Sequence, residues 1–108
     1  MKKKILITGG AGYIGSMLAS KLVHLDYDVT VIDLLKFSSN SLNHLYSFKN
    51  FKLIVGDVRN KNLIKTEIKK NEFIIPLAGL VGAPLCKKNK KEAISVNLDS
   101  IRLLMNYI

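Results

Sequence analysis

Short apolar runs alternate with longer amphipathic segments along the chain. The runs at residues 4–7, 28–33, 51–55 and 73–77 are rich in isoleucine, valine and leucine, which is typical of buried parallel strands. Helical periodicity predicts helices over residues 13–25 and 61–70, a short helix over 42–48, and a last helix from about residue 90 to the end. Strands that alternate with helices favour a parallel sheet with right-handed crossovers.

The same periodicity assigns the sheet-facing side of two helices. These residues are Ile14, Leu18, Leu22 and Leu25 in the first helix, and Leu63, Ile64 and Ile68 in the second. Ser41 ends a polar stretch that could cap the short helix, and Asn60 could cap the helix after it. Pro76 cannot donate a ladder hydrogen bond, which weakens the end of the fourth strand.

The first strand runs directly into a glycine-rich turn. Residues 10–15, Gly-Ala-Gly-Tyr-Ile-Gly, match the pattern G-x-G-x-x-G between a predicted strand and a predicted helix. Glycine permits positive φ and lets the backbone approach a pyrophosphate, and the free amides of a helix start favour a phosphate. The alternative interpretation is a strand-to-helix turn that binds nothing.

The second strand ends in Asp33, roughly 20 residues after the glycines, where a ribose-binding carboxylate is expected. This context favours dinucleotide binding. A carboxylate repels a 2′-phosphate, and neither Leu34 nor Leu35 is an arginine, so the pattern favours NAD over NADP. The positive charge of Lys36 is the one nearby feature that would favour NADP instead. The expected strand order 3-2-1-4 places a ligand crevice between strands 1 and 4.

Composition places the chain among small globular domains. Its 108 residues, 48% hydrophobic and 23% charged, suffice for one domain with a core. Cys86 is the single cysteine and cannot form an internal disulfide, so we expect a reducing, cytoplasmic compartment. No run reaches the length of a membrane helix or of a signal-peptide core, so we expect no membrane association.

The net charge of +9 could steer nucleic acid or anionic ligands. The lysines are spread over several regions, however, and no aromatic residues are interleaved with them as a base-stacking surface requires. Lys61, Lys65 and Lys69 share one helix face that we expect to be solvated. We therefore expect no nucleic-acid partner.

Several other polar residues can be explained by a purely structural role. His24 and His44 lack metal-ligand spacing, so we expect no metal site. Asp57 ends the third strand and could contact an adenine edge, with Val58 packed on the ring, or it could be a turn or capping residue. Asn97 is unusual inside a helix and could be exposed or reach the crevice floor.

Four segments of the chain match the motifs of one known family. Residues 8–15 resemble the signature T-G-G-x-G-[YF]-[IL]-G, and residues 56–60 resemble G-D-[IVL]-R-[DN]. Residues 77–82 are similar to the family's strand-4 segment, and residues 96–104 to its helix V-N-x-x-[GS]-[TI]-x-x-[LV]-L. Together these segments resemble the extended short-chain dehydrogenases/reductases, the NAD-dependent nucleotide-sugar epimerases and dehydratases such as UDP-glucose 4-epimerase. The resemblance spans the whole chain, in order and at the family's spacing.

The resemblance implies a partial Rossmann-type α/β fold, a parallel sheet with helices on both faces, and NAD as cofactor. It implies a pyrophosphate loop, a ribose-binding Asp33, an adenine contact at residues 57–58, and a fourth-strand segment beside the middle of the cofactor. The implied cofactor-binding residues are Gly9, Gly12, Tyr13, Ile14, Asp33, Leu34, Asp57, Val58, Leu77, Ala78, Gly79 and Asn97.

The family's catalytic Y-x-x-x-K pair is absent, because no tyrosine here is followed four residues later by lysine. We therefore expect no catalytic residue, and residues 1–108 to form the N-terminal part of an NAD(P)-binding domain, without a substrate domain, truncated relative to the family. The expected function is cofactor binding without turnover, with a nucleotide-sugar substrate in full-length members. The alternative is a non-catalytic dinucleotide-binding module that acts through a partner or a homo-oligomer, joined at the unpaired fourth strand or the last helix.

Overall fold

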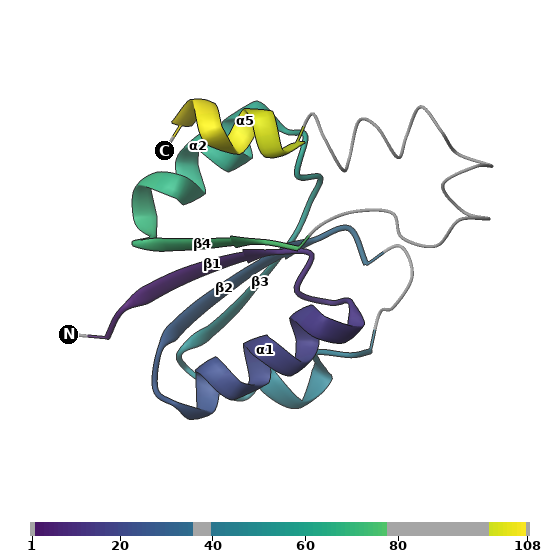
Figure 1. Cartoon of the computed structure of the whole chain (residues 1–108). Coiled ribbons are helices and arrows are strands. Elements are labelled where there is room, and N and C mark those ends of the chain that lie inside the picture. The colour runs from purple at the N-terminus through teal and green to yellow at the C-terminus, as the bar shows by residue number, and fades with distance from the viewer. Residues whose placement is uncertain (1, 36–39, 78–99, 108) are drawn as a thin grey trace.

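Four parallel strands form one sheet in the order β3-β2-β1-β4 (Figure 1). The computed structural model describes residues 2–35, 40–77 and 100–107. The strands are β1 (Lys4–Thr8), β2 (Asp28–Asp33), β3 (Phe51–Val55) and β4 (Phe73–Pro76). The predicted parallel α/β sheet and its strand order are confirmed.

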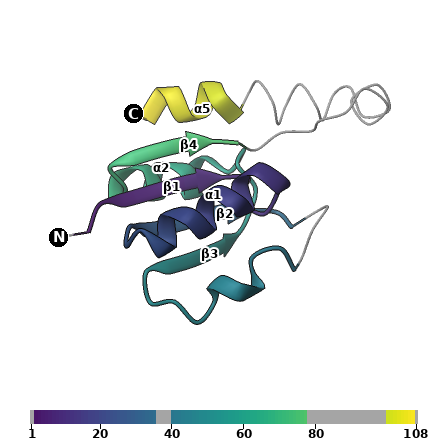
Figure 2. The same cartoon turned by 60° about the horizontal axis from the view of Figure 1, so that its bottom comes forward.

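Helices cover both faces of this sheet. The helix α1 (Tyr13–His24) and the 3₁₀ turn η1 (Asn43–Leu45) lie on one face, and α2 (Lys61–Lys70) and α5 (Ser100–Tyr107) lie on the other (Figures 1 and 2). A hydrophobic core lies on each face of the sheet, and alternate residues of β1 belong to the two cores. Ile5 and Ile7 pack on the α1 side, and Leu6 packs on the α2 side. Among the described residues, no helix is both long and apolar enough to span a bilayer.

The buried face of α1 differs from the predicted one. Leu18 and Leu22 pack against the core as expected, but Ile14 is 67% exposed and Leu25 is 58% exposed. The fully buried positions of the helix are instead Gly15, Ala19 and Val23. Gly15 allows the start of the helix to lie close to the preceding turn, because a Cβ there would come within 2.5 Å of the Gly9 oxygen. Leu25 lies beyond the last helical residue, as the C-cap.

The predicted short helix over residues 42–48 is only the 3₁₀ turn η1. Leu42 and Leu45 are both fully buried. Their spacing of three residues matches the three residues per turn of a 3₁₀ helix, which places both on one side. The expected cap is also wrong, because the N-cap position belongs to Leu42 and no side chain caps η1.

The second half of the described fold agrees closely with the sequence. Asn60 caps α2, since its side-chain oxygen accepts a hydrogen bond of 3.2 Å from the Leu63 amide. Lys61, Lys65 and Lys69 are exposed, as predicted for a solvated face. The strand β4 ends at Pro76 rather than at Leu77. Of the predicted last helix, only α5 falls within the described residues, where Ile101 and Leu104 pack on the core and Met105 is 67% exposed.

Candidate functional site

The four parallel strands all end at the same edge of the sheet, its carboxyl edge. Hydrogen bonds continue the strand pairing into the loops that follow: the Gly9 amide donates to the Ile32 carbonyl at 2.8 Å, and the Gly56 amide donates to the Asp33 carbonyl at 3.1 Å. On the other side of β1, the Leu77 amide donates to the Thr8 carbonyl at 2.7 Å. These contacts hold the starts of the loops next to one another.

Glycines in the turn after β1 serve different purposes. Gly9 has a φ of 81°, a conformation that side chains disfavour. A Cβ on Gly15 would lie 2.5 Å from the Gly9 carbonyl oxygen, and a Cβ on Gly10 would lie 2.6 Å from Val31. Within the described part of the chain, a Cβ on Gly12 would meet only the Gly9 oxygen, at 3.6 Å. Gly10 and Gly15 are therefore required by packing, whereas Gly12 is exposed and leaves space for an approaching ligand.

The start of α1 faces solvent. Its N-cap residue is Gly12, which has no side chain to cap the helix, and its first turn carries no acidic residue. Tyr13 is 81% exposed and Ile14 is 67% exposed. An uncapped helix start concentrates amide donors and the positive end of the helix dipole, which together favour an anion such as a diphosphate.

The Asp33 carboxylate lies beside this turn and already has two backbone partners. Its Oδ2 accepts a hydrogen bond from the Ala11 amide at 3.0 Å, and its Oδ1 accepts one from the Leu35 amide at 2.7 Å. Each carboxylate oxygen has a second lone pair, so both can still accept from ribose hydroxyls. Leu34, the next residue, is 45% exposed.

Asp57 follows β3 and is held by Arg59. The Arg59 Nη2 donates to the Asp57 Oδ2 at 2.6 Å, and Nε contacts both carboxylate oxygens, at 2.9 and 3.1 Å. The Arg59 amide also donates to Oδ1, at 2.8 Å. The side-chain hydrogen bond from Arg59 lowers the pKa of Asp57 below its ordinary value of 3.8, against an opposing effect of partial burial. The carboxylate is therefore held in one orientation, and its negatively charged form is favoured.

Val58 stands between Asp57 and Arg59 in the sequence, but its side chain points into the core. Its side chain is 5% exposed and packs with Leu6, Ile32 and Ile64 in the core under α2. A base at this place would therefore meet the backbone of Val58 more than its side chain. Leu77, at the end of β4, is 37% exposed.

We call the predicted residues that gather here the carboxyl-edge site. They are Gly9, Gly12, Tyr13, Ile14, Asp33, Leu34, Asp57, Val58 and Leu77. Ala78, Gly79 and Asn97 lie outside the described residues. At least one candidate residue therefore lies at the end of each strand or soon after it.

Two further residues at this edge, Ser41 and Arg59, were given no role in a binding site by the sequence, where Ser41 was expected only as a possible helix cap. The Ser41 hydroxyl donates a hydrogen bond of 2.6 Å to the Ala11 carbonyl oxygen, across 30 residues of chain. No local sequence pattern predicts a contact between residues so far apart in the chain. Arg59 stands two residues after Asp57, and this Asp-x-Arg spacing is the one signal that could have identified the ion pair.

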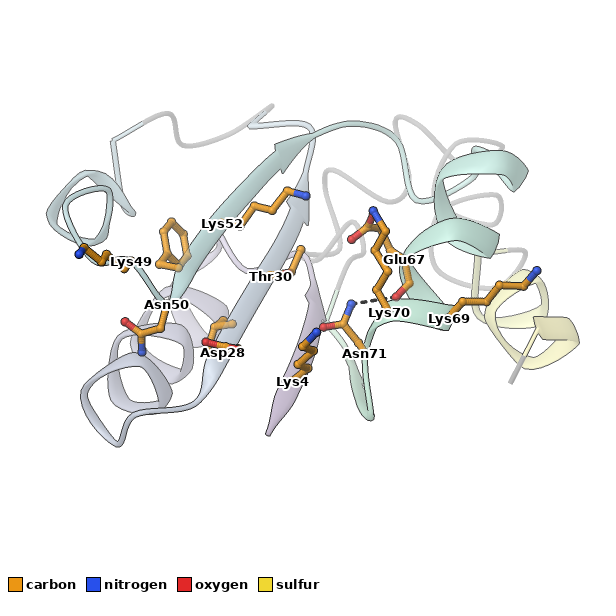
Figure 3. Close-up of a pocket in the computed structure, with 12 residues that line it drawn as sticks. Lys4, Asp28, Thr30, Lys49, Asn50, Lys52, Glu67, Lys69, Lys70 and Asn71 are labelled. Carbon is orange, nitrogen blue, oxygen red and sulfur yellow. Dashed lines mark hydrogen bonds and ion pairs between the residues drawn. The ribbon is translucent and has the colours of Figure 1, made fainter. Parts of the chain in front are cut away.

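A separate hollow of about 420 Å³ lies at the opposite edge of the sheet, where β1, β2 and β3 begin (Figure 3). Lysines predominate among its charged lining residues, which are Lys4, Lys49, Lys52, Lys69, Lys70, Asp28 and Glu67. One of these lysines, Lys70, pairs with Glu67 at 3.5 Å. Within the described ranges, no three metal-ligating side chains come together.

Comparison with known proteins agrees with this geometry. The sequence model described as "NAD dependent epimerase/dehydratase family" matches residues 5–108. The chain is similar to the UDP-N-acetyl-alpha-D-glucosaminuronate decarboxylase of Bacillus cytotoxicus, with 32% identity over 105 residues. That match covers 97% of this chain and 32% of the relative, so the chain spans about a third of the relative's length.

Solved structures show the same similarity. An epimerase from Methanothermobacter thermautotrophicus matches with a TM-score of 0.89 and 25% identity, over 98% of this chain and 31% of that one. A UDP-N-acetylglucosamine 4-epimerase from Methanobrevibacter ruminantium, solved with UDP-N-acetylmuramic acid, matches with a TM-score of 0.88 and 26% identity, over 99% of this chain and 34% of that one. The chain therefore belongs to the NAD dependent epimerase/dehydratase family.

Proposed function

We propose that this chain binds NAD at the carboxyl-edge site and is the NAD-binding portion of a nucleotide-sugar epimerase or dehydratase. The observation that carries the proposal is the uncapped start of α1 next to the Asp33 carboxylate. In this arrangement the diphosphate lies on the amides of Tyr13 and Ile14, and the adenosine ribose lies on Asp33.

The remaining candidate residues surround the rest of the cofactor. Asp57 accepts a hydrogen bond from the adenine amine, and the backbone of Val58 lies beside the ring, because the Val58 side chain is buried in the core. The middle of the cofactor lies along Leu77, Ala78 and Gly79, and Asn97 supports the adjoining loops. The exposed Gly12 fits this assignment, because among the described residues beyond its chain neighbours only the Gly9 oxygen, at 3.6 Å, lies within 4 Å of a Cβ placed on it.

Bound NAD supplies the hydride acceptor and donor for chemistry at a sugar carbon. The residues of this chain bind and orient it, and they contain no tyrosine with a lysine four positions later to act as acid and base. We therefore propose that residues 1–108 form part of an NAD-binding domain that binds the cofactor without turnover. The substrate class that we propose is a nucleotide sugar, as in full-length members of the family. Residues 1–108 contain a single cysteine, which favours the cytoplasm.

Asp33 favours NAD over NADP in this proposal. Its carboxylate is anchored by two backbone amides, so it cannot easily move away from a 2′-phosphate. Two negative groups at hydrogen-bond distance repel each other strongly where water is partly excluded. Selectivity for NAD follows from that repulsion.

Isothermal titration calorimetry of the chain with NAD, NADP and ADP-ribose tests the proposal. We expect NAD and ADP-ribose to bind with similar affinity and NADP to bind at least about tenfold more weakly, a difference of about 1.4 kcal/mol. Folded protein that releases no heat with any of the three ligands would overturn the binding proposal. Conversion of a nucleotide sugar by the chain alone would overturn the absence of turnover.

A second candidate is a module that acts by association, and the exposure of β4 favours it. Among the described strands β4 pairs only with β1, and Phe73 is 50% exposed. Parallel strands are normally covered on both sides, so an apolar open edge promotes pairing with another chain. Sedimentation should show concentration-dependent dimers, and a strict monomer at high concentration would refute this candidate.

A further inference from the structure

Ser41 contacts the glycine turn from a distant part of the chain. Its hydroxyl donates a partly buried hydrogen bond of 2.6 Å to the Ala11 carbonyl oxygen. This length lies at the short end for a hydroxyl donor, which indicates a well-formed bond. Ser41 directly precedes the buried Leu42, which anchors this segment in the core on the α1 side.

Ala11 is thereby held on both sides. Its amide donates to the Asp33 Oδ2 at 3.0 Å, its carbonyl accepts from Ser41, and its side chain is 3% exposed. Two successive peptide groups of the turn are thus fixed by side chains from different parts of the fold. The second of them carries the Gly12 amide, which makes only a long 3.3 Å hydrogen bond to the Gly9 carbonyl.

The orientation of the Ala11–Gly12 peptide sets how α1 begins. Gly12 is the N-cap, and its carbonyl accepts the first helical hydrogen bond, from the Ser16 amide at 2.8 Å. If this peptide rotates, the amides of Tyr13 and Ile14 change direction with it. A turn that is already fixed before binding avoids the ordering cost that a ligand would otherwise have to offset.

We propose that Ser41 is a positioning residue of the diphosphate site: its hydroxyl fixes the Ala11–Gly12 peptide so that the amides at the start of α1 converge on the ligand. Ser41 acts through this peptide. The inference rests on the proposed binding of a dinucleotide at the carboxyl-edge site. It adds a determinant from outside the glycine pattern, and it predicts an effect on the diphosphate but not on the nucleoside.

The test compares ADP-ribose, measured by calorimetry, with adenosine, measured by NMR titration. Ser41→Ala should weaken ADP-ribose binding by about 5–10-fold, the worth of one hydrogen bond, and leave adenosine binding within about twofold. Ser41→Thr keeps the hydroxyl and should restore most of the affinity. Ser47→Ala, at an exposed serine of the same segment, is the matched control and should leave both ligands unaffected.

Three results would overturn the inference: ADP-ribose affinity unchanged in Ser41→Ala, equal losses for both ligands, or a Ser41→Thr variant no better than Ser41→Ala. Equal losses would mean that Ser41 only stabilises the fold. If folded wild-type chain binds neither ligand, the proposed function fails, and the role of Ser41 fails with it. If the wild type binds and Ser41→Ala binds equally well, only the role of Ser41 fails.

Discussion

The Asp33 carboxylate accepts a hydrogen bond of 3.0 Å from the Ala11 amide, 22 residues earlier in the chain. The acid proposed to bind the ribose therefore also ties the glycine turn to the end of β2. In the proposed complex, recognition of the ribose and the shape of the glycine turn would therefore depend on the same side chain. A substitution at Asp33 should affect both.

Asp33→Ala should lower the free energy of unfolding by about 1–2 kcal/mol, because it leaves the amides of Ala11 and Leu35 without their acceptors. Asp33→Asn keeps one carbonyl oxygen and should lose less stability. Both variants should lose NAD affinity. Urea denaturation and calorimetry measure the two effects, and a wild-type unfolding midpoint for Asp33→Ala would contradict the tether.

Substitution by alanine should mainly lower stability at Gly15 and mainly lower ligand affinity at Gly12. In Gly15→Ala the new Cβ would lie 2.5 Å from the Gly9 oxygen, which is backbone and cannot move aside. We expect a loss of about 1–3 kcal/mol in the free energy of unfolding, or failure to fold. Thermal unfolding followed by circular dichroism measures it.

Gly12→Ala meets only a 3.6 Å contact and should cost less than about 1 kcal/mol of stability. Its methyl group nevertheless enters the space through which a diphosphate approaches, so ADP-ribose affinity should fall at least about tenfold. Calorimetry on the folded variant measures the affinity. An unchanged affinity in Gly12→Ala would show that ligands do not approach the turn from this side.

The Asp57–Arg59 pair should give a pH-dependent contribution to stability. Because the folded-state pKa of Asp57 lies below its ordinary value of 3.8, this contribution is present above that pH and is lost as pH falls through the folded-state pKa. Arg59→Gln should return the pKa toward its ordinary value and cost at most about 1 kcal/mol at neutral pH, since the pair is partly exposed.

Carboxyl NMR titration and urea denaturation across acid pH measure both consequences of Arg59→Gln. The variant and the wild type should become equally stable once Asp57 is protonated in both. Arg102→Gln, at an exposed arginine of α5, is the control and should leave the Asp57 titration unchanged. An Asp57 pKa that is the same in Arg59→Gln and in the wild type would rule out Arg59 as its cause.

Asp26 offers a stabilising substitution. It follows α1 with a φ of 71°, and the amides of Asp26 and Tyr27 donate to the Val23 and Leu22 carbonyls at 3.1 Å, the pattern of a Schellman cap. Asp26→Gly should raise the free energy of unfolding by about 0.5–1 kcal/mol, because glycine adopts this conformation without steric cost. Its ion pair with Lys2 is exposed and contributes little.

Leu35→Gly is the contrast, because Leu35 also has a positive φ, of 58°, but packs against the core. There the lost burial should outweigh the relieved strain, and the variant should be less stable than the wild type. Chemical denaturation of both variants gives the comparison. A destabilised Asp26→Gly would mean that the aspartate itself stabilises the cap.

The strand positions and the glycine turn could be predicted because their signals are local: apolar runs, spacing and glycine geometry. The strand order then followed from the doubly wound fold that alternating strands and helices indicate. The buried face of α1 could not, since Ile14 and Leu25 fit helical spacing as well as the residues that are buried. Only the sheet decides that Gly15 and Ala19 face it. The Ser41 contact joins residues 30 apart, and no pattern around either residue indicates it.

The most direct test of the account is NMR mapping of ADP-ribose on the ¹⁵N-labelled chain. We predict that the backbone amides of Gly12, Tyr13 and Ile14 shift most, together with those near Asp33, while Thr30 and Asn71 at the opposite edge stay unchanged. Shifts confined to that opposite edge, or no shifts at saturating ligand in folded protein, would contradict a dinucleotide site at the start of α1.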